Sequence, residues 1–80
     1  MSDEPTTYAT LASADRHPST QGLLKFFTYA HLPDPLRTVS QSCAELAFVM
    51  VAQLPDGPEL TTGLRKLLEA KDCFVRARLP

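Results

Sequence analysis

A short break, Leu54-Pro55-Asp56-Gly57-Pro58, separates two long segments that both have the periodicity of a helix. Proline and glycine so close together end a helix and favour a turn. The segment on each side is about 20 residues long, and two helices joined by so short a loop pack antiparallel. The sequence therefore predicts an all-α chain built around an antiparallel helical hairpin.

The rest of the chain adds one shorter helix and an arm. Small and polar residues dominate residues 1–17, for which we expect a flexible N-terminal arm. Residues 18–80 form the predicted helical-hairpin domain, with helices over about 19–29, 34–53 and 58–78. A proline lies near the start of each helix, where the first turn tolerates it.

Aspartates are expected to cap the two longer helices. Asp34 is placed to accept hydrogen bonds from the open amides at the start of the second helix. Asp56 and Glu59 have the spacing of a capping box at the start of the third.

The second helix carries more apolar surface than one neighbour can cover. A coiled-coil-like seam with spacings of 3, 4, 3 and 4 is formed by Leu36, Val39, Cys43, Leu46 and Met50. A second face carries Ala44, Phe48 and Val51, and Val49 lies on a third. The short first helix can cover only one of these faces, and large exposed apolar patches are uncommon on monomers. We therefore expect a homo-oligomer.

Lys71 interrupts the apolar face of the third helix. At 100° per residue it falls in the middle of the stripe formed by Leu64, Leu67, Leu68, Phe74 and Val75. Burying an unpaired ammonium is costly. Two interpretations stay open: the stem packs while the charge reaches water or a neighbouring carboxylate, or the lysine meets a phosphate at a boundary between protomers.

Positive charge is concentrated at the end of the chain. Residues 60–80 hold five basic and two acidic side chains, a net charge of +3, whereas the whole chain carries −1. This favours a discrete anionic ligand over long DNA. The alternative is a solvated face with weak pairs at i,i+4, Arg65 with Glu69 and Asp72 with Arg76.

Three aromatic residues stand near the end of the first helix and are candidates for stacking on a base. We expect Phe26 and Phe27 to lie in the core. Tyr29 is left open between core and ligand, because its hydroxyl needs a polar neighbour.

Signals for catalysis are poor, and we expect neither an enzyme nor a metal or cofactor. The glycines are isolated, no HExxH or CxxC motif occurs, and His17 and His31 are too far apart to ligate from one helix. Without a signal peptide or a span of ~20 apolar residues, a cytoplasmic location away from membranes is predicted, with Cys43 and Cys73 free.

Three stretches together resemble a known family: residues 27–33 (FTYAHLP), 43–47 (CAELA) and 64–77 (LRKLLEAKDCFVRA). They are similar to the helical-hairpin domain shared by the bacteriophage anti-CBASS cyclic-nucleotide sponge and a related anti-Thoeris sponge. The resemblance covers about residues 20–79. It implies a homo-oligomer, hexameric in the better-known relatives. Such proteins hold cyclic di- and trinucleotide defence signals between protomers, in the host bacterial cytoplasm, without cleaving them.

The resemblance also implies site residues. The tyrosine that stacks on a base corresponds to Tyr29, and an arginine of the last helix corresponds to Arg76. The lysine with which that family contacts phosphate falls near Ala44, where this chain has no charge. The charge would then come from Lys25, Arg65 or Lys71.

The function expected from these observations is immune evasion by sequestering a nucleotide signal. One alternative is a helical interaction module that blocks a host protein through its apolar surface. A small DNA-binding regulator ranks last, because Glu69 and Asp72 interrupt the basic face that a recognition helix needs.

Overall fold

The computed structural model describes residues 16–80, and the part of the predicted arm over 1–15 lies outside the described residues. From residue 16 onward every regular element is helical, which confirms the all-α class. The elements are α2 (Pro18–Leu24), the 3-10 turn η1 (Lys25–Phe27), α3 (Asp34–Gln53) and α4 (Pro58–Arg78).

The two longer helices have the bounds expected from the sequence, but the first is shorter. The α-helix ends at Leu24 and continues as one 3-10 turn to Phe27. Thr28 then adopts extended backbone, and the amide of Leu32 donates to the carbonyl oxygen of Tyr29 in a following turn. The chain therefore leaves the helix about two residues before the predicted end.

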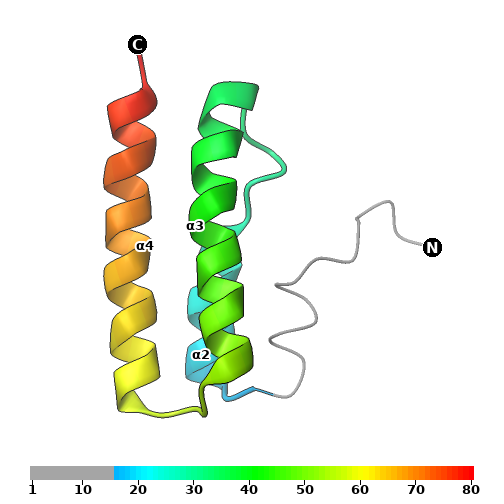
Figure 1. Cartoon of the computed structure of the whole chain (residues 1–80), viewed down its shortest axis with the longest axis vertical. Helices are drawn as coiled ribbons and strands as arrows, with labels where there is room; N and C mark the ends of the chain where they lie inside the picture. The colour runs from blue at the N-terminus through cyan, green and yellow to red at the C-terminus, as the bar shows by residue number, and fades with distance from the viewer. Residues whose placement is uncertain (1–15) are drawn as a thin grey trace, which may run out of the picture.

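The elements are arranged as a pair of long helices with a short one packed behind it. α3 and α4 lie side by side and run in opposite directions, and α2 lies behind α3 in the view of Figure 1. α2 packs against α4, whereas η1 packs against α3. The short first helix therefore contacts both long ones, on one side of the pair.

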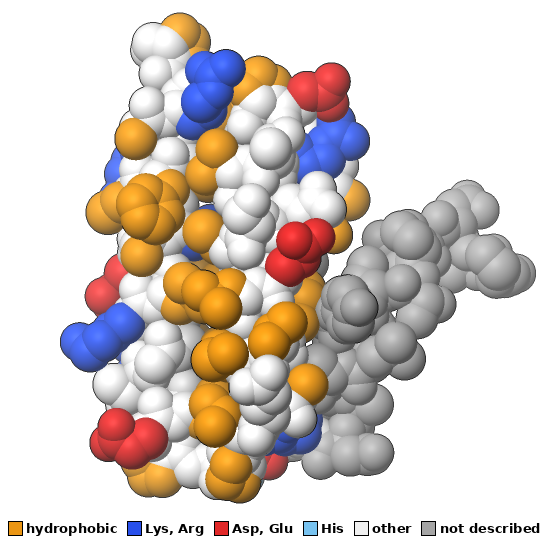
Figure 2. All heavy atoms as spheres, viewed as in Figure 1, with side chains coloured by type: hydrophobic (Ala, Val, Ile, Leu, Met, Phe, Trp, Pro, Cys, Tyr) orange, Lys and Arg blue, Asp and Glu red, His pale blue; other side chains and the backbone are white. Residues whose placement is uncertain are grey.

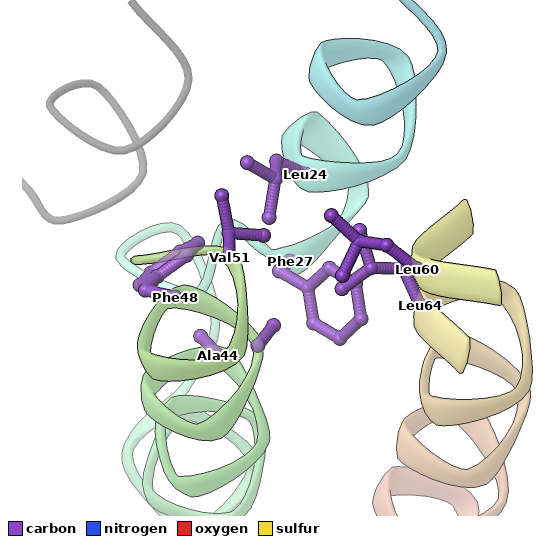
Figure 3. Close-up of a cluster of buried hydrophobic side chains, with 8 residues drawn as sticks. Leu24, Phe27, Ala44, Phe48, Val51, Leu60 and Leu64 are labelled. Atoms are coloured by element: carbon purple, nitrogen blue, oxygen red, sulfur yellow. The ribbon is translucent and has the colours of Figure 1, made fainter. Parts of the chain in front are cut away.

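The core is centred on Phe27, whose side chain is 0% exposed. Figure 3 shows its ring lying between α3 and α4, close to Leu60 and Leu64. Ala44 and Ala47 of α3 are also fully buried. Their short side chains leave the room that the ring fills. The remaining core members are Leu24, Phe48 and Val51.

The predicted seam of α3 is not the face that the chain buries. Leu46 is 49% exposed, and the other seam residues are only partly buried. The buried row is instead Ser40, Ala44, Ala47, Phe48 and Val51. The heptad argument failed because it favours large side chains, whereas here small residues let Phe27 enter from the first helix. That helix covers the second apolar face of α3, and the seam is left half open.

Both predicted aspartate caps are wrong. Asp34 is the first residue of α3, and its carboxylate pairs with Arg37 rather than with backbone amides. No side chain caps the start of α4, where Gly57 holds the N-cap position. The Asp56 carboxylate instead contacts Arg16, His17 and Thr20.

A band of apolar side chains remains on the face turned away from α2. Figure 2 shows it running along α3 and its boundary with α4. Leu46 and Val49 of α3 and Phe74 of α4 are among the large apolar side chains that are about half exposed. The single chain therefore leaves part of its apolar surface unburied.

Candidate functional site

Asp56 joins the beginning of the described chain to the turn between α3 and α4. Its Oδ1 accepts a hydrogen bond from the Thr20 hydroxyl at 2.8 Å and pairs with Arg16 Nε at 3.2 Å. Its Oδ2 accepts from the backbone amide of His17 at 3.1 Å. The bonds from Thr20 and Arg16 hold the pKa of Asp56 below its usual value. The last two residues of the predicted flexible arm are therefore held in place.

Arg16 also closes the end of α3. Its guanidinium donates to the carbonyl oxygen of Val51 and, at 2.6 Å, to that of Leu54. Carbonyl groups at a helix C-terminus lack partners within the helix and attract positive charge. Arg16 supplies both a donor and a cation, so the Arg16–Asp56 contact stabilises the fold.

A groove of about 520 Å³ lies beside this contact. We call it the Asp56 groove; its lining residues are His17, Ser19, Thr20, Asp56, Gly57, Pro58, Thr61 and Thr62. None of these lining residues is Lys or Arg, and the Asp56 carboxylate would repel an anion. This groove is therefore a poor site for phosphate.

A second groove, of about 350 Å³, has the opposite character. We call it the Lys71 groove. One wall comes from η1 and the loop after it, the other from one side of α4. Its lining residues are Lys25, Phe26, Thr28, His31, Leu32, Lys71, Asp72, Val75 and Arg76. Lys25 of η1 therefore shares one concave surface with Lys71 and Arg76 of α4.

Lys71 is the most enclosed of these cations. Its side chain is 13% exposed, and its Nζ pairs with Asp72 Oδ1 at 2.8 Å. Of the two interpretations of this lysine, the structure shows the stem packed and the charge met by a neighbouring carboxylate. The pairing also places a carboxylate among the three cations.

The expected i,i+4 pairs of α4 do not form. Asp72 pairs with Lys71 instead, and Arg76 Nη2 lies 3.3 Å from Cys73 Sγ. Over residues 16–80 neither Arg65 nor Glu69 takes part in an ion pair. Within residues 16–80 no carboxylate pairs with the guanidinium of Arg76.

Phe26 is the aromatic residue of the groove, and the expectation that it lies in the core is wrong. It is 54% exposed, and Lys25 Nζ lies 5.3 Å from its ring centroid. Successive helical residues point about 100° apart, so only one of two adjacent phenylalanines can face the core. Phe27 does, as expected. Phe26 was named as a candidate for stacking on a base, but the core was the favoured place for both phenylalanines.

Two predicted site residues lie outside the groove. Tyr29 is partly buried against the core and is not among the lining residues. Arg65 is exposed on α4. At 1.5 Å per residue it stands ~9 Å along the helix from Lys71 and ~16 Å from Arg76. The structure brings together Lys25, Lys71 and Arg76, but not Tyr29 or Arg65.

Cys43 does not look like a nucleophile in this setting. Burial raises the pKa of its thiol, and the Lys71 ammonium only partly opposes this shift. It packs partly buried against the core. A raised pKa keeps the thiol protonated near neutral pH, and the thiolate is the reactive form.

The described residues offer neither a metal site nor a membrane-spanning helix. Among residues 16–80, no three His, Cys, Asp or Glu side chains are grouped so that they could hold a metal ion. In the same part of the chain, none of the helices is long and apolar enough to cross a membrane. The chain matches no family model, no curated protein and no solved structure.

Proposed function

We propose that the chain binds a small nucleotide through its phosphates in the Lys71 groove and sequesters it unchanged. One observation carries this proposal: three of the five candidate site residues, Lys25, Lys71 and Arg76, line the same groove. Three cations around one hollow form strong, charge-assisted hydrogen bonds with phosphate oxygens.

The size and lining of the groove suit one nucleotide unit. Its volume of about 350 Å³ lies at the lower end of the ~300–1,000 Å³ typical of ligand pockets. The exposed ring of Phe26 offers a face on which a base can stack, a contact worth roughly 1–3 kcal/mol. Phosphate and base therefore each have a partner in the groove.

The groove is better suited to holding a ligand than to cleaving it. Asp72 is engaged by Lys71, and a guanidinium such as that of Arg76 does not act as a base. His31 also lines the groove, but within residues 16–80 no acidic side chain pairs with its imidazole to orient it. We therefore propose sequestration, without turnover, of a cyclic di- or trinucleotide defence signal, in line with the resemblance to the phage sponges.

The exposed apolar face supports the further proposal that the chain is a homo-oligomer in the form of the family's hairpin. Leu46, Val49 and Phe74 would be covered by a second copy.

The test is calorimetry with a panel of cyclic di- and trinucleotides and ADP-ribose derivatives. We expect at least one to bind, to be recovered chemically intact after the protein is denatured, and to bind about tenfold more weakly to Lys25→Gln, Lys71→Gln or Arg76→Gln. Lys66→Gln, an exposed lysine of α4 outside the groove, is the matched control and should bind within twofold of the unaltered protein.

Circular dichroism of each variant separates lost binding from lost folding. Light scattering on the same samples should give a mass that is a multiple of 8.8 kDa. Absence of heat with every compound would end the nucleotide proposal. A monomer at micromolar concentration would end the oligomer proposal.

A second candidate function is favoured by the same apolar face. If the assembled protein still exposes Leu46, Val49 and Phe74, these side chains suit a groove on a host protein better than solvent. A stoichiometric partner recovered from host lysate, and lost on Leu46→Glu, would favour this interaction module. No binding to any nucleotide should accompany that result.

A further inference from the structure

The Lys71 groove holds a carboxylate among its cations, and we infer that Asp72 selects the ligand. It opposes anions that bring only negative charge, and it accepts a hydrogen bond from a ligand that also carries an N–H or O–H donor. The inference rests on the proposed function in one respect, that the ligand occupies the Lys71 groove.

One of the three cations, Lys71, is paired with the Asp72 carboxylate. Lys71 Nζ lies 2.8 Å from Asp72 Oδ1, and the lysine side chain is only 13% exposed. An enclosed stem restricts the ammonium to the neighbourhood of the groove wall. A phosphate that binds Lys71 must therefore come within a few ångströms of the Asp72 carboxylate, and like charges at that distance repel.

The other two cations remain available. Arg76 is one turn after Asp72, yet its guanidinium is directed to Cys73 Sγ at 3.3 Å. Lys25 has no carboxylate partner within the described chain and lies over the ring of Phe26. Phosphate is therefore best placed on Lys25 and Arg76, the two cations of the groove that have no carboxylate partner within the described chain.

One carboxylate oxygen of Asp72 is available to accept a hydrogen bond from a ligand. Its side chain is 48% exposed, and within residues 16–80 Oδ2 has no hydrogen-bond partner. A carboxylate accepts hydrogen bonds and cannot donate them when ionised. A sugar hydroxyl or the amino group of a base satisfies this oxygen, whereas fully ionised pyrophosphate has no donor to offer it.

The experiment compares Asp72→Asn with the unaltered full chain, using inorganic pyrophosphate, cyclic di-AMP and cyclic di-GMP as probes. Removing one negative charge beside the phosphate should strengthen pyrophosphate binding about tenfold. Loss of the charged acceptor should leave cyclic dinucleotide binding unchanged or weaken it by up to tenfold. The preference for cyclic dinucleotide over pyrophosphate should therefore fall by tenfold or more.

Two variants serve as controls. Glu69→Gln removes the same charge from an exposed position of α4 outside the groove, and it should leave the preference as it was. Asp72→Ser removes the charge with a smaller side chain and should reproduce the gain for pyrophosphate. Thermal unfolding of each variant confirms that the fold is kept, as expected for a half-exposed side chain.

The outcomes are separable from those of the proposed function. Unchanged pyrophosphate affinity in both Asp72 variants, or an equal gain in Glu69→Gln, overturns the selective role of Asp72. If the unaltered chain binds no nucleotide but Asp72→Asn gains pyrophosphate binding, the proposed function fails while the masking of Lys71 stands. If neither protein binds any probe, both fail.

Discussion

Replacing Phe27 by alanine should remove a large part of the stability of this chain. The side chain is fully buried, and its ring lies between α3 and α4 (Figure 3). Its neighbours Ala44 and Ala47 are too short to fill the space that the ring would leave. The cavity should therefore persist, so the loss should lie in the upper part of the ~3–5 kcal/mol range for Phe→Ala.

This loss is large relative to the total free energy of unfolding of the chain. At ~0.05–0.15 kcal/mol per residue, a chain of 80 residues has a free energy of unfolding of ~4–12 kcal/mol. For a domain of this size each 1 kcal/mol lowers the melting temperature by ~4–8 °C. We therefore expect Phe27→Ala to melt at least ~15 °C lower, and to be partly unfolded at 37 °C if the parent lies in the lower half of the range.

The neighbouring phenylalanine is the matched control. Phe26 is 54% exposed, so Phe26→Ala should cost less than ~1 kcal/mol. Urea unfolding followed by circular dichroism measures both variants, at one protomer concentration because association shifts apparent stability. Equal losses for the two variants, or a loss below ~2 kcal/mol for Phe27→Ala, would refute the packing described for the core.

Two further predictions concern titratable groups. The pKa of Asp56 is lower in the folded chain than in the unfolded one, so its stabilising contribution is complete above the unfolded pKa of ~3.9 and is lost as the pH falls through the folded value. Asp56→Asn should therefore lower the urea midpoint at pH 6, and the gap to the parent should close below about pH 4; a gap that is the same at pH 2.5 would contradict the Arg16 and Thr20 contacts. Burial raises the pKa of the Cys43 thiol, so iodoacetamide at pH 8 should alkylate Cys43 several-fold more slowly than the exposed Cys73, as mass spectrometry can follow. Lys71→Gln should slow Cys43 further, and an unchanged or higher rate would show that the ammonium does not act on the thiol.

The starts of the helices and the break between the two longer ones could be predicted because local chemistry sets them. Pro18, Pro35 and Pro58 each stand within the first two residues of a helix, and the break at residues 54–57 has no helical alternative. Such signals depend only on residues next to each other. The bounds of α3 and α4 agree with the expectation for that reason.

The buried face of α3 could not be predicted in the same way. Periodicity identified a seam of mostly large side chains that includes Leu36 and Leu46. The structure buries Ala44 and Ala47 more completely, because a small residue is needed wherever Phe27 from another element approaches. The element that packs against α3 decides which of its faces is buried, and that element lies elsewhere in the sequence.

The same limit explains the cap at Asp56 and the composition of the groove. Asp56 and Glu59 matched a capping box locally, but Arg16, 40 residues away, binds the carboxylate instead. Lys25 and Arg76 were singled out separately, and only the fold places them around one groove. Phe26 also lines the groove, although the core was the favoured place for it, and Asp72 has no local signal that marks it as part of a site.

The Arg16–Asp56 contact also bears on how the chain is made. During synthesis, residues near the N-terminus leave the ribosome first. Leu24 and Phe27 emerge well before Leu60 and Leu64, which complete their burial. Until α4 has been made, the nascent chain exposes a leucine and a phenylalanine that chaperones can bind. Because Arg16 and Asp56 lie 40 residues apart in the sequence, their contact carries the entropic cost of closing a long loop.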